Sequence, residues 1–301
     1  TTRGFACIKG LKQQAIYESP DRLRTPLHRQ GEDFQACGWD EANGAIGAKL
    51  KQLMRDHGPD SIGLYLGTAA GFSLPPAFGA AGCRQGRGSK QLYGPATQDC
   101  ANKFHVAEHV YGYPFIQPFP DVDRCDCLIL VGGNPAVSKM SFLHLPDALR
   151  RLKAIEERGG KVFVVDPRRT ETAKAVGRHV FIRPDSDVFF YLSFLHELLR
   201  LEGCRRDVLA AHTRGFDAVA SLAKAWSPER TAPVTGIGPA TLSDMVSAYV
   251  QAPRAALYCS TGVNMGSQGS LCFWLQECIN LAAGKLDRPG GTLVGRGIID
   301  F

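Results

Sequence analysis

The chain has 301 residues, of which 44% are hydrophobic and 21% are charged, and its formal net charge is +6. This length can bury a substantial core and suits one large α/β domain or two to three smaller ones. No apolar run approaches the roughly 20 residues that cross a bilayer, so we predict no membrane span. Lys and Arg are scattered and form no stripe, which argues against a nucleic-acid partner, whereas a small anionic ligand suits the modest positive charge.

The ten cysteines lack the dense, even spacing of a secreted disulfide scaffold. Half of them lie among apolar residues, as buried free thiols do, namely Cys125, Cys127, Cys259, Cys272 and Cys278. No signal peptide is visible in the sequence. Together these features predict a reduced, cytoplasmic protein.

The first third of the chain begins with a polar segment. Residues 11–45 are rich in charged and turn-forming residues and predict a connecting arm that ends at a helix start near Trp39. A helix over 43–56 and a strand over 62–67 follow, and the strand runs into a loop of small residues over 68–73.

From about residue 100, predicted helices and strands alternate. The predicted strands are 127–131, 161–168, 179–183 and 255–259, and the predicted helices are 102–111, 146–158, 170–176, 187–202, 239–250 and 269–284. The alternation predicts a doubly wound α/β fold, with mostly parallel sheets and helices on both faces, preceded by the turn-rich amino-terminal arm.

Open α/β sheets bind ligands at the carboxyl ends of their strands, and the loop 132–138 follows the first apolar strand. Its two glycines leave backbone N–H groups accessible, while Asn134 and Ser138 add hydrogen-bonding side chains. We expect a phosphate to bind there, at the start of the following helix. A plain strand-to-helix turn is the alternative, since the loop matches neither GxGxxG nor a Walker motif.

Three further loops follow strands. Asp166 stands where a nucleotide-binding fold places a carboxylate against ribose hydroxyls, and a helix cap is its alternative role. Asp187, after the next strand, has the acceptors to pair with guanine, although N-capping is the commoner use of such an Asp. The segment 261–269 is a Gly-rich loop that opens a helix. Four such loops on successive strands indicate a large, nucleotide-like ligand.

Six segments, in order along the chain, resemble the molybdopterin oxidoreductases of the dimethyl-sulfoxide-reductase, formate-dehydrogenase and nitrate-reductase type. They are GFACIKG at 4–10, RLRTPL at 22–27, WDEA at 39–42, GNP at 133–135, DPRRTETA at 166–173 and LAAGKLDRPGG at 281–291. The resemblance covers nearly the whole chain and identifies it as the amino-terminal part of a catalytic subunit.

The resemblance implies molybdenum or tungsten held by the dithiolenes of two pterin guanine dinucleotides. The positions that match contacts to the guanosine end are Gly133, Asn134, Ser138, Asp166, Arg168 and Asp187. We also assign to cofactor binding four residues of the Gly-rich loop, Gly262, Asn264, Met265 and Gln268.

The resemblance also implies a [4Fe-4S] cluster in many family members. Cys7 matches its fourth ligand, and Lys9 matches the lysine that bridges cluster and pterin. Such a cluster needs four thiolates, and the other three would lie before Thr1, so an unpaired thiol is the alternative for Cys7.

One protein residue completes the metal's coordination in this family, and counting from neighbouring motifs assigns it to Asp99. Cys100 is the rival because a thiolate is the softer ligand, and N-capping of helix 102–111 is the alternative role of Asp99. An Asp ligand resembles nitrate reductases, whereas formate dehydrogenases have Cys or selenocysteine followed by His. Arg296 matches the active-site Arg of formate dehydrogenases, or is a solvated surface group.

The resemblance predicts three parts: 1–45 as the remnant of an iron–sulfur domain, 46–98 as the first part of a cofactor-binding α/β domain, and 99–301 as a second, Rossmann-like one. We expect two-electron redox chemistry on a small substrate such as formate, nitrate or another oxyanion, or an S- or N-oxide. The partner would be the missing carboxyl-terminal half of the enzyme or a redox protein. A non-catalytic scaffold, as in respiratory NADH dehydrogenase, is the rival, and a simple NAD dehydrogenase is third because it would need GxGxxG.

Overall fold

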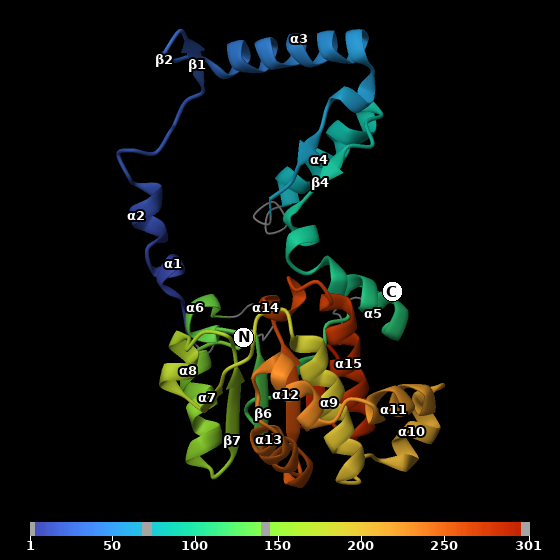
Figure 1. The fold of residues 1–301 in the computed structure, drawn as a ribbon. Coiled ribbons are helices and arrows are strands. Elements are labelled where there is room, and N and C mark those ends of the chain that lie inside the picture. Colours follow the sequence, from blue (N-terminus) through green and yellow to red (C-terminus); the bar gives the residue numbers. More distant parts are fainter. Residues whose placement is uncertain (1–3, 68–73, 140–144, 296–301) are drawn as a thin grey trace. The chain divides into compact units, whose positions relative to one another are not determined.

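The computed structural model describes residues 4–67, 74–139 and 145–295. The chain divides into two compact units, one formed by Ala6–Thr97 and the other by Thr1–Phe5 with Gln98–Phe301 (Figure 1).

The unit Ala6–Thr97 begins with regular structure where the sequence predicted an arm of turns. It contains α1 (Ile8–Leu11), α2 (Gln13–Tyr17) and an antiparallel hairpin of β1 (Leu27–Gln30) and β2 (Asp33–Ala36). Gly31, with φ +66°, supplies the left-handed residue that the hairpin turn needs. The turn-rich arm is therefore not confirmed, although α3 (Trp39–His57) begins at the predicted residue.

The rest of this unit is a small parallel sheet. β3 (Leu64–Tyr65) pairs with β4 (Leu92–Tyr93), and α4 (Leu74–Arg87), which the sequence did not predict, connects them. The unit has little core: among its described residues, Ile62 and Ala80 are the apolar side chains that are buried.

The other unit is built on a four-stranded parallel sheet. Its strands are β6 (Cys127–Val131), β7 (Lys161–Val165), β8 (Arg178–Val180) and β9 (Ala255–Cys259), in the order β8-β7-β6-β9. All four strands were predicted, although β7 and β8 end earlier than expected. After β8 the chain leaves the sheet, since the Arg183 N–H donates to Thr235 O at 2.8 Å instead of to a neighbouring strand.

Helices cover both faces of this sheet, which confirms the doubly wound fold (Figure 1). Alternate strand residues point to opposite faces, so each strand contributes to two hydrophobic cores. One face, with Leu128, Leu130, Val162 and Val164, packs against α7 (Ala148–Glu157) and α8 (Glu171–Ala175). The other, with Ile129, Val131, Phe163 and Val165, packs against α9 (Asp187–Arg200), α13 (Pro239–Gln251) and α15 (Gly269–Ala282).

Several elements of this unit were not predicted. The charged stretch before α13 forms three helices, α10 (Arg206–His212), α11 (Phe216–Lys224) and α12 (Pro228–Thr235). The left-handed Gly215 lies between α10 and α11, and the left-handed Gly236 ends α12. β5 (Phe119–Pro120) pairs with β10 (Thr292–Leu293). α5 (Ala101–Tyr111) matches its prediction, and α6 (Pro135–Ser138) and α14 (Thr261–Asn264) are single turns after β6 and β9.

The strand order places a topological switch point between β6 and β9. From β6 the chain continues outward through β7 and β8, and later returns to add β9 on the opposite side of β6. The loops after β6 and β9 therefore diverge at the carboxyl edge, where open α/β sheets bind their ligands. None of the helices in the described segments is long and apolar enough to cross a bilayer.

Candidate functional site

The loops that follow β6 and β9 meet backbone to backbone at the switch point. The Gly262 N–H donates to Gly132 O at 3.0 Å. A Cβ on Gly262 would lie 2.7 Å from Gly132 O, and one on Gly132 would lie 2.8 Å from Val263 N. Both positions need glycine because a side chain on either would push the two loops apart.

Asn134 ties the loop after β6 to α8. Its Oδ1 accepts from Thr172 Oγ1 at 2.8 Å and from Thr172 N at 3.2 Å, while its Nδ2 donates to Glu171 Oε2 at 2.7 Å. The amide predicted to contact a ligand therefore also holds two loops of the carboxyl edge in register.

The start of α6 does not provide the phosphate site that the sequence suggested. Pro135 has no N–H, and the Ala136 N–H donates to Thr172 Oγ1 at 3.0 Å. The N–H groups of Val137 and Ser138 both donate to Asn134 O. These donors are already used within the protein, and the Ser138 side chain is exposed beside them.

Asp166 lies at the end of β7 and is not a helix cap. Its Oδ1 accepts from the Arg168 N–H at 2.8 Å, whereas α8 is capped by Thr170, whose Oγ1 accepts from the Ala173 N–H at 3.1 Å. Arg168 is exposed and pairs with Glu171. Hydrogen bonds from Arg168 and Asn134 help to hold the pKa of Glu171 at about 2.

The two aspartates after β8 have different roles. Asp185 accepts from Ser267 N at 2.7 Å and from Ser267 Oγ at 2.8 Å, and these bonds hold its pKa below the usual range. It thereby fastens the loop after β8 to the Gly-rich loop. Asp187 is half-buried at the first position of α9, where Ser186 takes the N-cap position and makes no side-chain cap. Burial raises the pKa of Asp187 to about 6, and the nearby charges of Asp185 and Asp166 add to the shift.

The Gly-rich loop presents both exposed and buried groups. Gly262, Met265 and Gln268 are exposed, and Met265 is 67% accessible. Asn264 is buried, and within the described part of the chain its Nδ2 has no hydrogen-bond partner. The four predicted loops thus converge on one edge of the sheet.

The segment before α5 reaches the same edge. Thr261 Oγ1 donates to Asp99 Oδ1 at 3.2 Å, and Asn102 Nδ2 donates to Asn264 O at 2.7 Å. Asp99 is exposed and is not the N-cap of α5, since Cys100 takes that position without a side-chain cap. The Cys100 thiol is buried, and burial together with the Asp99 charge raises its pKa.

A buried charged cluster that the sequence did not predict lies behind this edge. Lys103 is 1% exposed, donates to Cys259 O at 2.7 Å, and lies over the rings of Tyr258 and Phe273. Glu277 is 2% exposed; burial raises its pKa, while Tyr111 and Lys103 act in the opposite direction. The available signal was the position of Lys103 on the same helical face as the apolar Val106 and Ala107.

Cys7, Lys9 and Arg296 are the remaining predicted residues. Cys7 and Lys9 belong to the other unit, where backbone hydrogen bonds from Gly10 and Lys9 lower the pKa of Cys7. Arg296 lies outside the described residues. Over 4–67, 74–139 and 145–295, no group of three or more His, Cys, Asp or Glu side chains is placed to hold a metal ion.

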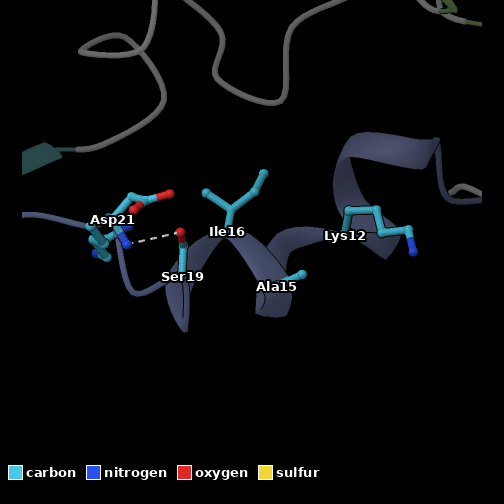
Figure 2. Close-up of a pocket in the computed structure, with 6 residues that line it drawn as sticks. Lys12, Ala15, Ile16, Ser19 and Asp21 are labelled. Atoms are coloured by element: carbon cyan, nitrogen blue, oxygen red, sulfur yellow. Dashed lines mark hydrogen bonds between the residues drawn. The ribbon is translucent and has the colours of Figure 1, made fainter.

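A hollow of about 440 Å³ lies on the short helices of the unit Ala6–Thr97, lined by Lys12, Ala15, Ile16, Ser19, Asp21 and Arg22. Figure 2 shows Lys12 directed away from Asp21, and the Asp21 N–H bonded to Ser19 Oγ at 3.3 Å. Its residues offer no converging set of catalytic groups.

Comparisons with known proteins agree with this geometry. The family model of the molybdopterin oxidoreductases matches residues 22–299. The chain is 25% identical to F420-dependent formate dehydrogenase 1 subunit alpha of Methanococcus maripaludis over 95% of its length, and 26% identical to a nitrate reductase of Klebsiella oxytoca over 95%. It spans 41% and 32% of those two proteins.

A solved structure shares the fold. Acetylene hydratase from Pelobacter acetylenicus superposes with a TM-score of 0.76 and 19% sequence identity, over 93% of this chain and 38% of the other. The sequence match, the doubly wound sheet and the loops at its carboxyl edge lead to one assignment: the chain belongs to the molybdopterin oxidoreductase family.

Proposed function

We propose that residues 98–301 bind the guanosine end of a pterin guanine dinucleotide in a molybdenum or tungsten oxidoreductase. The observation that carries the proposal is the half-buried carboxyl of Asp187 at an edge where three carboxylates lie near one another. Carboxylate oxygens accept hydrogen bonds, so this edge suits the donor groups of a ribose and of the N1–H and N2–H edge of guanine.

The residues fit such a ligand in three respects. Asp187 is half-buried, burial raises the pKa of its carboxyl, and hydrogen bonds from a donor ligand would relieve the cost of that desolvation. Asp166 uses one carboxylate oxygen for the Arg168 N–H, and its other oxygen can accept from a ribose hydroxyl. The buried Nδ2 of Asn264 has no partner within the described ranges and can donate to a ligand oxygen.

We further propose that Asp99, and not Cys100, is the protein ligand of the metal. Asp99 is exposed and is oriented by Thr261. The Cys100 thiol is buried, and burial raises its pKa, which disfavours the thiolate form that binds a metal. An oxygen ligand gives more weight to oxyanion reduction, as in nitrate reductases, than to formate oxidation.

When bound, the metal centre supplies the two-electron redox chemistry, and the protein supplies binding, orientation and electrostatics. In this chain Asp187 and Asp166 hold the nucleotide, Asp185 keeps the Gly-rich loop against them, and Thr261 holds the Asp99 carboxylate. In the complete protein, Cys7 would be one of the four thiolate ligands of a [4Fe-4S] cluster, and Lys9 would lie between that cluster and the pterin.

A second polypeptide surface is part of this proposal. The unit Ala6–Thr97 exposes many large apolar side chains, among them Leu11 at 67%, Leu23 at 72%, Phe34 at 62% and Trp39 at 67%. Exposed apolar surface of this extent marks a protein interaction site. We infer that further enzyme sequence or a redox partner covers it. The ten free cysteines favour a reducing, cytoplasmic compartment.

The proposal is tested on the complete protein purified from the cells that naturally produce it. Metal content is measured by mass spectrometry, and GMP is measured after acid hydrolysis. We expect molybdenum or tungsten together with GMP. A folded protein that yields neither would favour the non-catalytic scaffold, and metal without GMP would refute the dinucleotide form.

A further inference from the structure

Phe181 is a large apolar side chain left exposed beside the nucleotide edge. It follows the last residue of β8 and is 60% accessible to solvent. Val180 pairs with Val165 across the sheet, and the Asp166 N–H donates to Val180 O at 3.1 Å. The backbone of Phe181 therefore lies next to that of Asp166 at the carboxyl edge.

Two contacts support the Phe181 ring. Its centroid lies 4.1 Å from that of the His179 ring, with the planes inclined at 59°. The His179 ring is itself held in place, since its Nε2 donates to the Asp166 carbonyl oxygen at 3.0 Å. The Phe181 ring is thus supported by His179, which is bonded to the backbone of Asp166, the aspartate proposed to bind the ribose.

A short, ordered loop connects Phe181 to Asp187. Arg183 N bonds to Thr235 O at 2.8 Å, and Ser186 Oγ bonds to Arg183 O at 2.6 Å. Phe181, with its exposed ring, and Asp187, with its half-buried carboxyl, are therefore six residues apart in the chain, and the backbone of Asp166 lies next to that of Phe181.

We propose that Phe181 stacks on the purine base of the bound guanine nucleotide. The inference rests on the proposed function and divides recognition between two side chains. Stacking on an aromatic ring accepts any base, because every base has a π-face. Asp187, in contrast, reads the donor edge that distinguishes guanine, since it accepts hydrogen bonds only.

The experiment uses the complete protein without cofactor and two free nucleotides, GDP and IDP, titrated by calorimetry. The two differ only in the exocyclic amino group of the base. We expect wild type to prefer GDP. F181A should weaken both nucleotides at least about 5-fold while the GDP-to-IDP ratio stays unchanged. D187A should remove most of the preference for GDP.

Matched variants separate stacking from general apolar contact. F181W should keep wild-type affinity, and F181L should lose it because leucine has no π-face. L222A removes an apolar side chain that is 54% exposed on α11 and should change neither affinity.

Wild-type affinity in F181A or F181L would overturn the stacking role, and a lost GDP preference in D187A would then still support the proposed function. Failure of the wild-type protein to bind either nucleotide would refute both proposals.

Discussion

Thr261 and Asp99 are 162 residues apart in the chain and are joined by a hydrogen bond, with Thr261 Oγ1 donating to Asp99 Oδ1 at 3.2 Å. The contact holds Asp99, the proposed metal ligand, against the loop after β9. This loop forms one side of the topological switch point between β6 and β9. The first turn of α5 is fastened there by Asn102 and Lys103 as well.

We predict that Asp99→Ala in the complete enzyme removes one oxygen ligand from the metal, because the exposed carboxylate is the group that can reach it. X-ray absorption at the molybdenum or tungsten edge measures the change. Cys100→Ala serves as the matched control and should leave the metal's sulfur ligation unaltered. Loss of a sulfur ligand in that control, with oxygen ligation kept in Asp99→Ala, would show that the neighbouring cysteine is the ligand.

The raised pKa of Asp187 predicts a pH dependence of nucleoside binding. Since the pKa in the folded protein is about 6, above the ordinary value of 3.8, the protonated carboxyl stabilises the fold. This contribution is present at low pH and is lost as the pH rises through about 6. Guanine needs the ionised carboxylate as its acceptor, so binding should strengthen over the same range.

Guanosine is the suitable probe because it has no phosphate to titrate in this range. Its affinity should rise by up to about tenfold per pH unit below the midpoint near 6. D187N cannot ionise and should bind with no such dependence. At pH 7, D187A should cost roughly 1–3 kcal/mol of guanine nucleotide binding, the penalty for unpaired donors. A flat profile in wild type would assign Asp187 to the helix alone.

Gly262→Ala should destabilise the unit that contains the sheet. The new Cβ would lie 2.7 Å from Gly132 O and 2.9 Å from Gly132 Cα, and backbone atoms cannot move aside cheaply. We expect a loss of about 1–3 kcal/mol in the free energy of unfolding, measured by urea denaturation. Gly238→Ala, where a Cβ would meet nothing within 4 Å, should cost less than about 1 kcal/mol. Equal effects would mean that the close approach of the loops is unimportant.

Lys103→Met should destabilise the protein by about 3–5 kcal/mol, because it removes a buried cation near the buried Glu277 carboxyl. The same chain offers the control for this prediction. Glu277→Gln combined with Lys103→Met should recover much of the loss, since no uncompensated charge is left. Thermal unfolding of the two single variants and of the double variant gives the coupling energy, and additive effects would exclude an interaction between the two charges.

The strands of the main sheet and the loops that follow them could be predicted from local sequence. Continuous apolar runs such as Cys127–Val131 predict strands buried on both faces, and the four strands of the main sheet were placed from such runs. Because parallel strands carry their carboxyl ends to one edge, the order of strands and loops along the chain is enough to assign Asp166, Asp187 and Gly262 to a common site.

Which atoms at that edge are available to a ligand depends on how the loops pack against one another. Sequence spacing could not distinguish Asp185, which is bonded to Ser267, from Asp187, which is half-buried at the start of α9. Nor could it show that the N–H groups of α6 are taken by Thr172 and Asn134. Local sequence specifies the periodicity of each element, whereas burial and hydrogen-bond partners come from residues far apart in the chain, and only packing brings those together.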